Sequence, residues 1–488
     1  MMTSRSMHPS IRHRRGSVAV MYVSMLVPII AFAGLALDLS FAYTRRTEMQ
    51  SVADAAAMAA ARALNGTVQG VAAAQAAART IAERQRYSFG KPVVWQDAAL
   101  RFSDSPDKPD GDWLPAGAIN ATRAASFFYA KVDTRALDPA HGLTDVVFMR
   151  AINGPREPLM TAARAIAGRT SIQVTPLAVC AIRNTEVSSH DVVKGGGVVE
   201  QELLQYGFRR GVSYNLLNMN PNGATPVSYL VNPLDFPDEP EDLNHRSLAV
   251  VRPFVCSGSI AASNLRTGSR LYVADPFPAT LITELNSRFA NYTGSSCNPV
   301  AAPPDRNIKE YDAWYFGWWM NSTGTINGSA EPHVIGGAKL TVADQSGAVV
   351  GITRTHYGPL WSFSKAVHYN SGAPDGVGAP FPKADWRYLY PVGSGTELIS
   401  NYSDTAASPY SSNNPMHFAF PPTPGLSPRR VLNIPLLECP VTGSVGRVLA
   451  IGRFFMSSQA DAAIPAVHGE FGGLLKDNEL AATVGLYK

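Results

Sequence analysis

Residues 17–63 read SVAVMYVSMLVPIIAFAGLALDLSFAYTRRTEMQSVADAAAMAAARA. The first part, Ser17–Leu37, contains 21 residues and no charged side chain. At a rise of 1.5 Å per residue it would form about 31 Å of helix, close to the hydrocarbon thickness of a bilayer. Helical character continues after Asp38, so the stretch predicts one continuous helix. Residues 17–38 are expected to cross a membrane, and the rest of the helix to stand outside it.

Charged residues on the two sides of this span predict its orientation. The basic residues that precede it are Arg5, Arg12, Arg14 and Arg15. After it, Arg45 and Arg46 are offset by Asp38 and Glu48. Because basic flanks are retained on the cytoplasmic side, residues 1–16 are expected to form a cytoplasmic tail. In a bacterium the remainder of the chain would then be periplasmic, with an inner-membrane anchor.

A cleaved signal peptide is the alternative interpretation of the same stretch. Its cleavage site would be the triplet Ala31-Phe32-Ala33, after a short apolar core. Against this, the apolar sequence continues to Leu37 and the residues beyond it still favour a helix. We therefore favour a retained anchor over an exported binding or hydrolytic domain that has lost its signal segment.

Alanine dominates the segment that follows the span. It occupies nine positions between residues 42 and 63, and it is the strongest intrinsic helix former. Asn65-Gly66 is typical of a helix end, and Val68–Arg86 predicts a second helix. Residues 39–86 are therefore expected to form a helical stalk. Small side chains also allow close helix packing, so a solvated rod and a packing face both remain open.

Two further domains are predicted beyond the stalk. Residues 87–171 mix strand candidates with a helix candidate, LMTAARAIAGR (159–169), and predict a small α+β domain. Residues 172–488 contain many short strand candidates between Pro-, Gly- and Asn-rich connections, including LAVVRPFVC (248–256) and VGRVLAIGRFFM (445–456). They predict one large, irregular β-rich domain. The expected fold class is α+β.

Composition excludes one class of partner. The formal charge is +4 over 488 residues, and the basic residues are scattered rather than clustered. A nucleic-acid-binding protein should carry a basic stripe or patch. Binding to nucleic acid is therefore not expected.

Cysteine usage predicts an oxidising compartment. The four cysteines are Cys180, Cys256, Cys297 and Cys439. All follow the span, without CxxC spacing or a histidine at ligand spacing, so no metal site is predicted. Two disulfides are expected instead. Three connectivities are open, and proximity favours Cys256 with Cys297 and Cys180 with Cys439. Four buried free thiols are the alternative.

Signatures of catalysis are absent from the sequence. It contains no G-x-S-x-G elbow, H-E-x-x-H helix, Walker phosphate loop or G-x-G-x-x-G turn. The acid-rich loop 104–112 lacks the spacing of a calcium loop and predicts a solvated turn. Two aromatic clusters, 311–320 and 357–369, would suit either a ligand groove or an ordinary core, and we favour the core. No cofactor, metal or enzymatic activity is expected.

The segment 14–64 resembles the N-terminal region of Tad (Flp) pilus assembly proteins of the TadE/TadG-like type. The matching features are Arg15-Gly16, Pro28, Gly34, Asp38, Tyr43, Arg46, Gln50 and the Ala-Asp-Ala-Ala-Ala run that begins at Ala53. More weakly, four later segments are similar to periplasmic regions of TadG-related proteins. They are YGFRRGVSYNL (206–216), HYGPLWSFSKAVHY (356–369), RRVLNIPLLECPV (429–441) and VHGEFGG (467–473).

The resemblance implies a scaffold or minor-pilin role in the inner membrane. Gly16, Pro28, Gly34 and Asp38 would then belong to the membrane anchor, and the arginine flank Arg12, Arg14 and Arg15 would orient it. The implied partners are other Tad proteins, namely TadE/TadF-like pseudopilins, the inner-membrane platform and the Flp pilin.

Two departures from the family pattern refine this expectation. Met21 stands five residues after Gly16, where processed pilins carry a glutamate, so Gly16-Ser17 is not expected to be cleaved. The D-x-S-x-S adhesion motif of some TadG proteins is also absent. An adhesin at the pilus tip is therefore only a third interpretation.

Overall fold

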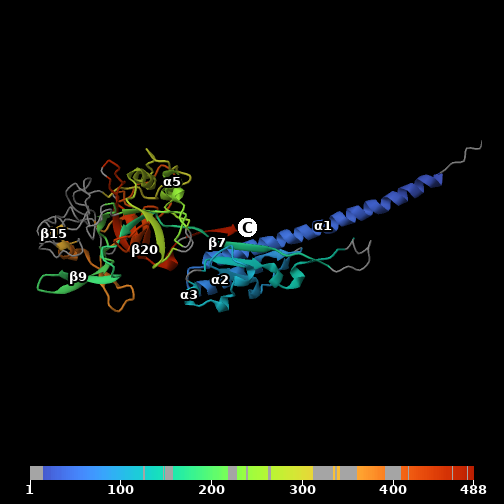
Figure 1. Cartoon of the computed structure of the whole chain (residues 1–488), viewed down its shortest axis with the longest axis horizontal. Coiled ribbons are helices and arrows are strands. Elements are labelled where there is room, and N and C mark those ends of the chain that lie inside the picture. The colour runs from blue at the N-terminus through green and yellow to red at the C-terminus, as the bar shows by residue number, and fades with distance from the viewer. Residues whose placement is uncertain are drawn as a thin grey trace, which may run out of the picture. The chain divides into compact units, whose positions relative to one another are not determined.

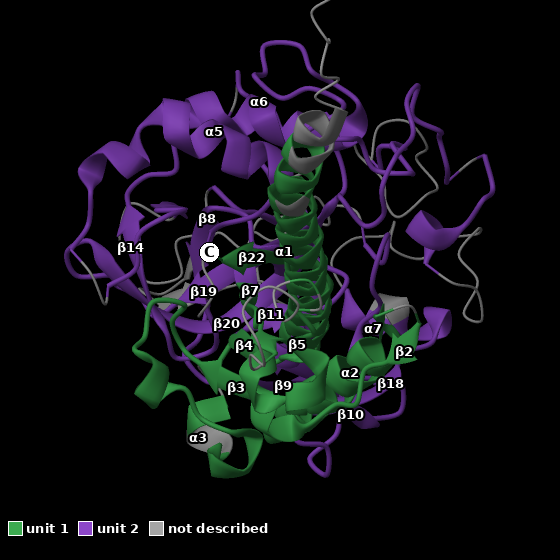
Figure 2. Cartoon of the chain, turned by 90° about the vertical axis from the view of Figure 1, so that its right-hand side faces the viewer, with its two compact units in different colours: residues 1–168, 484–488 green, residues 169–483 purple. Residues whose placement is uncertain are grey.

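The chain folds into two compact units. The structure is a computed structural model that describes residues 15–88, 90–124, 127–146, 148, 158–217, 228–237, 240–261, 265–311, 333–335, 338–340, 360–390, 408–415, 417–463, 465–480 and 482–487. Unit 1 comprises residues 1–168 with 484–488, and unit 2 comprises residues 169–483 (Figure 2). The α+β class, with a long N-terminal apolar helix and a large β-rich region, is confirmed.

Unit 1 is built on two helices that pack through alanine. α1 (Arg15–Ala63) is one unbroken helix with Pro28 inside it (Figure 1). It ends before Gly66, whose φ of 79° is left-handed. Thr67 then caps α2 (Val68–Arg84), and its side chain accepts a hydrogen bond from the backbone N–H of Gly70 at 3.0 Å. The facing sides of the helices are buried and consist largely of alanine, because small side chains let the two backbones approach closely.

A four-stranded sheet completes this unit, in the order β22-β7-β4-β3. Its strands are β3 (Leu100–Ser103), β4 (Tyr129–Asp133), β7 (Arg164–Ile172) and β22 (Ala482–Tyr487). The smaller elements are β1 (Arg86–Tyr87), β2 (Lys91–Pro92), α3 (Ala121–Ala124), β5 (Leu143–Thr144) and β6 (Leu159–Met160). One hydrophobic core contains residues of both helices and of the sheet. Segments 39–86 and 87–168 therefore lie in one compact unit, together with the last residues of the chain.

The helix predicted over residues 159–169 is wrong. This segment forms β6 and then β7, which pairs antiparallel with β4. Alanine favours a helix intrinsically, but Ala165 and Ala167 are buried on the sheet in the core that they share with the alanines of α1 and α2. Tertiary packing overrides propensity here, because β7 pairs with β4 and the alternation of a strand buries both Ala165 and Ala167 in that core.

Unit 2 is centred on a seven-stranded sheet in the order β12-β21-β20-β14-β13-β8-β19. Its strands are β8 (Leu177–Cys180), β12 (Ser213–Asn215), β13 (Ser228–Val231), β14 (Arg270–Ala274), β19 (Val431–Leu437), β20 (Val445–Met456) and β21 (His468–Leu475). β19 pairs with β8 in parallel and with β20 in antiparallel register. Five of these strands, β20, β14, β13, β8 and β19, therefore close on themselves.

A second sheet of this unit has the order β11-β10-β17-β18, with β9 also paired to β10. Its strands are β9 (Val187–Val193), β10 (Val199–Gln205), β11 (Phe208–Arg209), β17 (Val367–Tyr369) and β18 (Val377–Pro380). A separate pair is formed by β15 (His333–Ile335) and β16 (Ala338–Leu340). The helices of the unit are α5 (Leu248–Ser257), α6 (Ile282–Leu285) and α7 (Trp386–Leu389).

The strand predicted at LAVVRPFVC is also wrong, because these residues form α5. Val251 and Val255, four residues apart, are buried on one face of the helix, a spacing that also fits a helical pattern. Gly258 ends the helix with a left-handed φ of 73°. The apolar run alone fits both a strand and a helix. The glycine at position 258 is the feature that favours a helix, because glycine commonly ends one.

Two disulfides cross-link unit 2. Cys180, at the end of β8, is joined to Cys439, which follows β19, with Cα atoms 5.6 Å apart. Cys256, in α5, is joined to Cys297 with the same Cα separation of 5.6 Å. Each bond ties segments that are distant in sequence.

Candidate functional site

The N-terminal half of α1 carries an apolar surface that the rest of unit 1 leaves bare. Its exposed large apolar residues are Met21, Tyr22, Val23, Met25, Leu26, Ile29, Ile30, Phe32, Leu35 and Leu37. Within the described part of the chain, α1 is the one helix long and apolar enough to cross a membrane. A bare helix of this kind is stable in a nonpolar surrounding and unfavourable in water. This surface, residues 21–37, is the first candidate site.

The residues predicted for the anchor fall into three groups. Pro28 is exposed on the bare surface, whereas Gly34 and Asp38 are buried. Gly16 and Arg15 lie in the first turn of α1. Arg12 and Arg14 lie outside the described residues.

Burial begins within the apolar stretch itself. Gly34, Asp38, Ala42 and Met49 follow one another along one buried face of α1. A Cβ atom placed on Gly34 would lie 2.5 Å from the Cβ of Phe148, which belongs to the connection between β5 and β6. The glycine is therefore needed for a close approach between this connection and α1. Phe148 lies in the largely apolar segment DVVFMRAI (145–152), which carries no local signal of a contact with α1.

The charged residues after the apolar stretch fasten α1 to the rest of unit 1. Arg45 lies 3.3 Å from Glu48 and places its guanidinium 4.9 Å from the centre of the Tyr87 ring. Glu48 also accepts a hydrogen bond from the backbone N–H of Ser88 at 3.2 Å. Further along, the amide of Gln50 donates to the carbonyl of Arg164 at 3.2 Å. These contacts fix where the helix leaves its packed region.

The acid-rich loop 104–112 is an ion-paired part of unit 1. Asp110 lies 2.8 Å from Arg164 and 3.3 Å from Lys131. These hydrogen bonds lower the pKa of Asp110, with Arg164 the larger cause. Arg164 also meets Asp133 at 3.1 Å. Within this loop, Asp110 pairs with Arg164 and Lys131, and Asp104 pairs with Lys108 at 2.7 Å.

The described residues of the segments 206–216, 356–369, 429–441 and 467–473 all belong to unit 2. Glu470, fully buried in β21, accepts hydrogen bonds from the backbone N–H groups of Ser362 (2.7 Å), Phe363 (2.9 Å) and Ser364 (2.7 Å). Burial raises the pKa of Glu470 to about 7. Nearby, the backbone N–H of Trp361 donates to the carbonyl of Gly211 at 3.1 Å. Three of the segments are thus joined directly.

Arg430 connects the fourth segment, residues 429–441, to its neighbours in unit 2. Its buried guanidinium donates to the carbonyls of Met456, Asn307, Lys309 and Ser457 at 2.7–3.0 Å. It also lies 4.4 Å from the ring centre of Phe455, on which Phe363 stacks at 5.2 Å. Burial lowers the pKa of Arg430. Because every one of these acceptors is a main-chain oxygen, Arg430 links separate backbone segments inside unit 2, which is a structural role.

The aromatic clusters fall partly outside the described residues. Of the first cluster, only Tyr311 is described, and it is buried against Arg430. In the second, Trp361 is fully buried and its indole N–H donates to the Tyr390 hydroxyl at 3.1 Å. Tyr311 and Trp361 belong to the core and Phe363 packs against it, as we favoured, whereas Tyr369 is half-buried.

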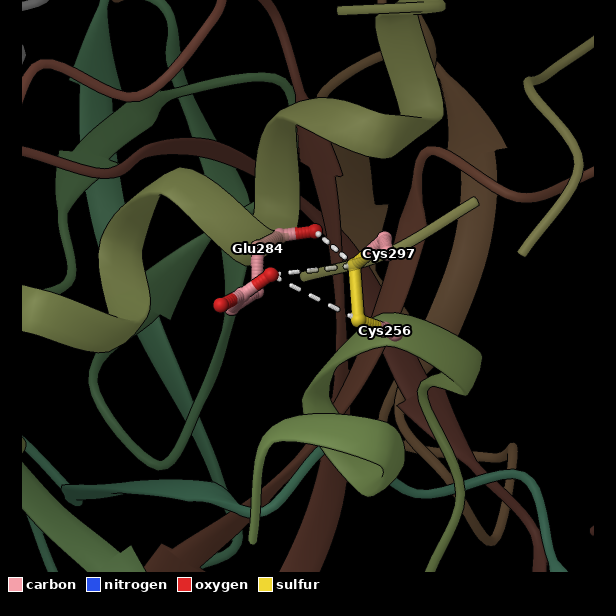
Figure 3. A group of neighbouring side chains, drawn as sticks. All are labelled: Cys256, Glu284 and Cys297. Atoms are coloured by element: carbon pink, nitrogen blue, oxygen red, sulfur yellow. Dashed lines mark hydrogen bonds between the residues drawn. A yellow bond between two sulfur atoms is a disulfide. The ribbon is translucent and has the colours of Figure 1, made fainter. Parts of the chain in front are cut away.

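Cys256, Glu284 and Cys297 place potential ligand atoms within 4.8 Å of one another (Figure 3). The two sulfurs are bonded to each other, so neither can supply a thiolate to a metal ion. Glu284 is fully buried and is held by Arg252 at 2.9 Å and by the backbone N–H of Ser296 at 2.9 Å. The group is therefore a structural cross-link beside an ion pair whose carboxylate, Glu284, is buried and whose arginine, Arg252, is partly exposed.

A cavity of about 610 Å³ also opens in unit 2. Arg210 and Arg453 line it, and burial lowers the pKa of Arg210 to about 10, with Arg453 adding to the effect. The rim carries Glu186, Asp375 and Glu479. Its mixed charge does not select one class of ligand.

The fold and the bare helix together define a class of protein. A long N-terminal helix is half exposed and apolar and half packed in a small α+β unit, and a disulfide-bonded β-rich unit follows. Residues 16–63 match the family model described as putative Flp pilus-assembly TadE/G-like, which confirms the resemblance over this segment. The matched segment is α1 almost in full. No curated protein and no solved structure matches the chain.

Proposed function

We propose that this chain is a membrane-anchored assembly component, a scaffold or minor pilin, of a Flp-type pilus system. The observation that carries the proposal is the coincidence of two features in α1. The segment that matches the pilus-assembly family also contains the bare apolar surface 21–37. A helix that must avoid water and belongs to an assembly family is suited to packing in a bilayer against the helices of partner proteins.

The proposed orientation places residues 1–16 in the cytoplasm and the bulk of the chain in the periplasm. Arg12, Arg14 and Arg15 support this orientation by their position before the span. The two disulfides support it independently, since such bonds persist in an oxidising compartment. The partners in the membrane would be TadE/TadF-like pseudopilins, the assembly platform and the Flp pilin.

Retention of the N-terminus follows from the residue at position 21. Met21 is 59% exposed on the bare surface and carries no carboxylate. In assembled pilins a glutamate at the matching position offsets the amine of a neighbouring subunit, an interaction that low dielectric strengthens. Without that group, processing at Gly16-Ser17 would gain nothing electrostatically. We therefore propose that the N-terminus is retained and that the chain acts as an anchor.

The test combines the mass of the mature N-terminus with extraction of membranes. We expect a product that begins at Met1 or Met2 and stays with the membrane in alkaline carbonate. As a control, Leu243→Cys changes an exposed residue of unit 2, outside the apolar surface of α1. It should leave the distribution of the protein between membrane and supernatant unchanged. A product that has lost everything before Gly34 would contradict the anchor and favour the exported domain.

A further inference from the structure

β5, β6 and the connection between them expose a set of large apolar side chains. The exposed fractions are 38% for Leu143, 36% for Phe148, 46% for Leu159 and 55% for Met160. Leu143 and Met160 are paired across the two antiparallel strands. We name the described residues 143–148 and 158–160, without residue 147, the β5–β6 ribbon. Apolar groups gathered on a narrow ribbon are unfavourable in water unless something nonpolar covers them.

The ribbon lies beside α1 at a defined height. Phe148 meets Gly34, which lies three residues before the end of the uncharged stretch at Leu37. Phe148 is therefore about 5 Å inside the proposed membrane span, at 1.5 Å per residue. Figure 1 shows the chain that leads into β7 running alongside α1 towards its N-terminal half.

A second measure places the other end of the ribbon. The carbonyl of Arg164 is level with Gln50, because the two are hydrogen-bonded. The chain from Arg164 back to Leu159 covers at most about 16 Å when it is extended, which corresponds to about 11 residues of helix. Leu159 is then close to the height of Leu39, just beyond Asp38. This height matches the headgroup region of a bilayer spanned by residues 17–38.

We propose that the β5–β6 ribbon is a second membrane-contacting element, whose apolar side chains enter the interface of the leaflet from which α1 emerges. This inference rests on the proposed anchor. The occupant of the apolar surface is lipid because Phe148 lies against Gly34, within the apolar stretch of α1, and the ribbon extends from there to the edge of that stretch. Apolar side chains that enter an interface reach about 5–10 Å into the boundary of headgroups and acyl chains. With two contacts instead of one, unit 1 would hold a fixed tilt on the membrane.

The experiment uses the full chain in nanodiscs of three parts phosphatidylethanolamine to one part phosphatidylglycerol. Its native cysteines are paired in disulfides, so a single introduced cysteine can carry a nitroxide label. The test positions are L159C and M160C. I29C, 64% exposed on α1, is the lipid control, and V193C, 60% exposed on β9, is the water control. The readout is collision with oxygen, which concentrates in lipid, against a water-soluble nickel chelate.

If the ribbon contacts lipid, L159C and M160C collide several-fold more with oxygen than with the chelate, like I29C and unlike V193C. If both ribbon labels behave like V193C while I29C still reports lipid, the inference fails and the anchor stands. If I29C also reports water, the anchor itself fails. If the ribbon labels are shielded from both reagents, a protein partner or a second copy covers the ribbon, and the proposal of lipid contact is wrong.

Discussion

Glu470 shows how much a single side chain organises in this protein. Its carboxylate accepts hydrogen bonds from the three consecutive backbone N–H groups of residues 362–364, more than a hundred positions away in sequence. A buried carboxylate of this kind is stable only with its hydrogen bonds in place. Two residues earlier in the same strand, His468 is 8% exposed, and burial lowers its pKa to about 4. The two groups make opposite contributions to the pH dependence of stability.

We predict that H468Q reduces the loss of stability on acidification. The folded-state pKa of His468, about 4, lies below the ordinary 6.5, so the unfolded chain takes up the proton first. The stability that the neutral histidine contributes is complete above pH 6.5 and is lost as the pH falls towards 4, by up to about 3 kcal/mol. Denaturant unfolding of the full chain in detergent at pH 7.5 and pH 4.5 measures the difference.

The matched variant for this measurement is E470Q. The pKa of Glu470, about 7, lies above its ordinary 4.5, so its contribution is present below pH 4.5 and is lost as the pH rises through 7. In E470Q the free energy of unfolding should therefore fall more steeply between pH 7.5 and pH 4.5 than in the native chain. In H468Q it should fall less steeply. Equal slopes for H468Q and the native chain would show that His468 does not titrate as proposed.

At the level of helices and strands, the fold of unit 1 depends on the packing of α1 against α2. Alanines of both helices are completely buried where the helices meet, among them Ala57 and Ala78. This explains why a stretch of high helical propensity is a core component rather than a solvated rod. Ala165 and Ala167 of β7 are buried in the same core, and they reach it from a strand that pairs with β4.

We predict that A78L destabilises unit 1 by about 1–3 kcal/mol, because a close-packed interface has no room for three added carbons. The control is A72L, which adds the same side chain to the same helix at an exposed position. Hydrogen exchange of α2 amides, followed by mass spectrometry, reads the effect locally. Similar exchange in both variants would mean that the two helices are not packed as described.

At the scale of the whole molecule, the covalent cross-links are confined to one unit. All four cysteines belong to unit 2, in bonds that span 259 and 41 residues. Unit 1 depends on its alanine core instead. The two units should therefore respond differently to a reducing environment.

We predict that a reductant lowers the stability of unit 2 by about 2–5 kcal/mol per bond and leaves unit 1 unchanged, because opening each loop returns entropy to the unfolded chain. Hydrogen exchange before and after reduction, compared between β20 and α2, measures both units in one sample. C256S with C297S should reproduce part of the effect without reductant. Loss of protection in α2 as well would show that the units do not fold independently.

Much of the architecture was predictable because it depends on local chemistry. The length of the uncharged run, the end of α1 near Asn65-Gly66 and the long strand at 445–456 follow from composition and spacing. Two segments were misassigned for an equally physical reason. Apolar or alanine-rich runs of about ten residues satisfy both helix and strand patterns, and only the available packing partner decides between them.

The sequence by itself determined that this chain begins with a long apolar helix of a pilus-assembly type, because those signals lie within 50 neighbouring residues. Only the tertiary structure decided what covers that helix. Phe148 reaches Gly34 from more than a hundred residues away, and Arg430 and Glu470 join segments from four parts of the chain. Such contacts depend on how distant segments pack, and no local pattern encodes them.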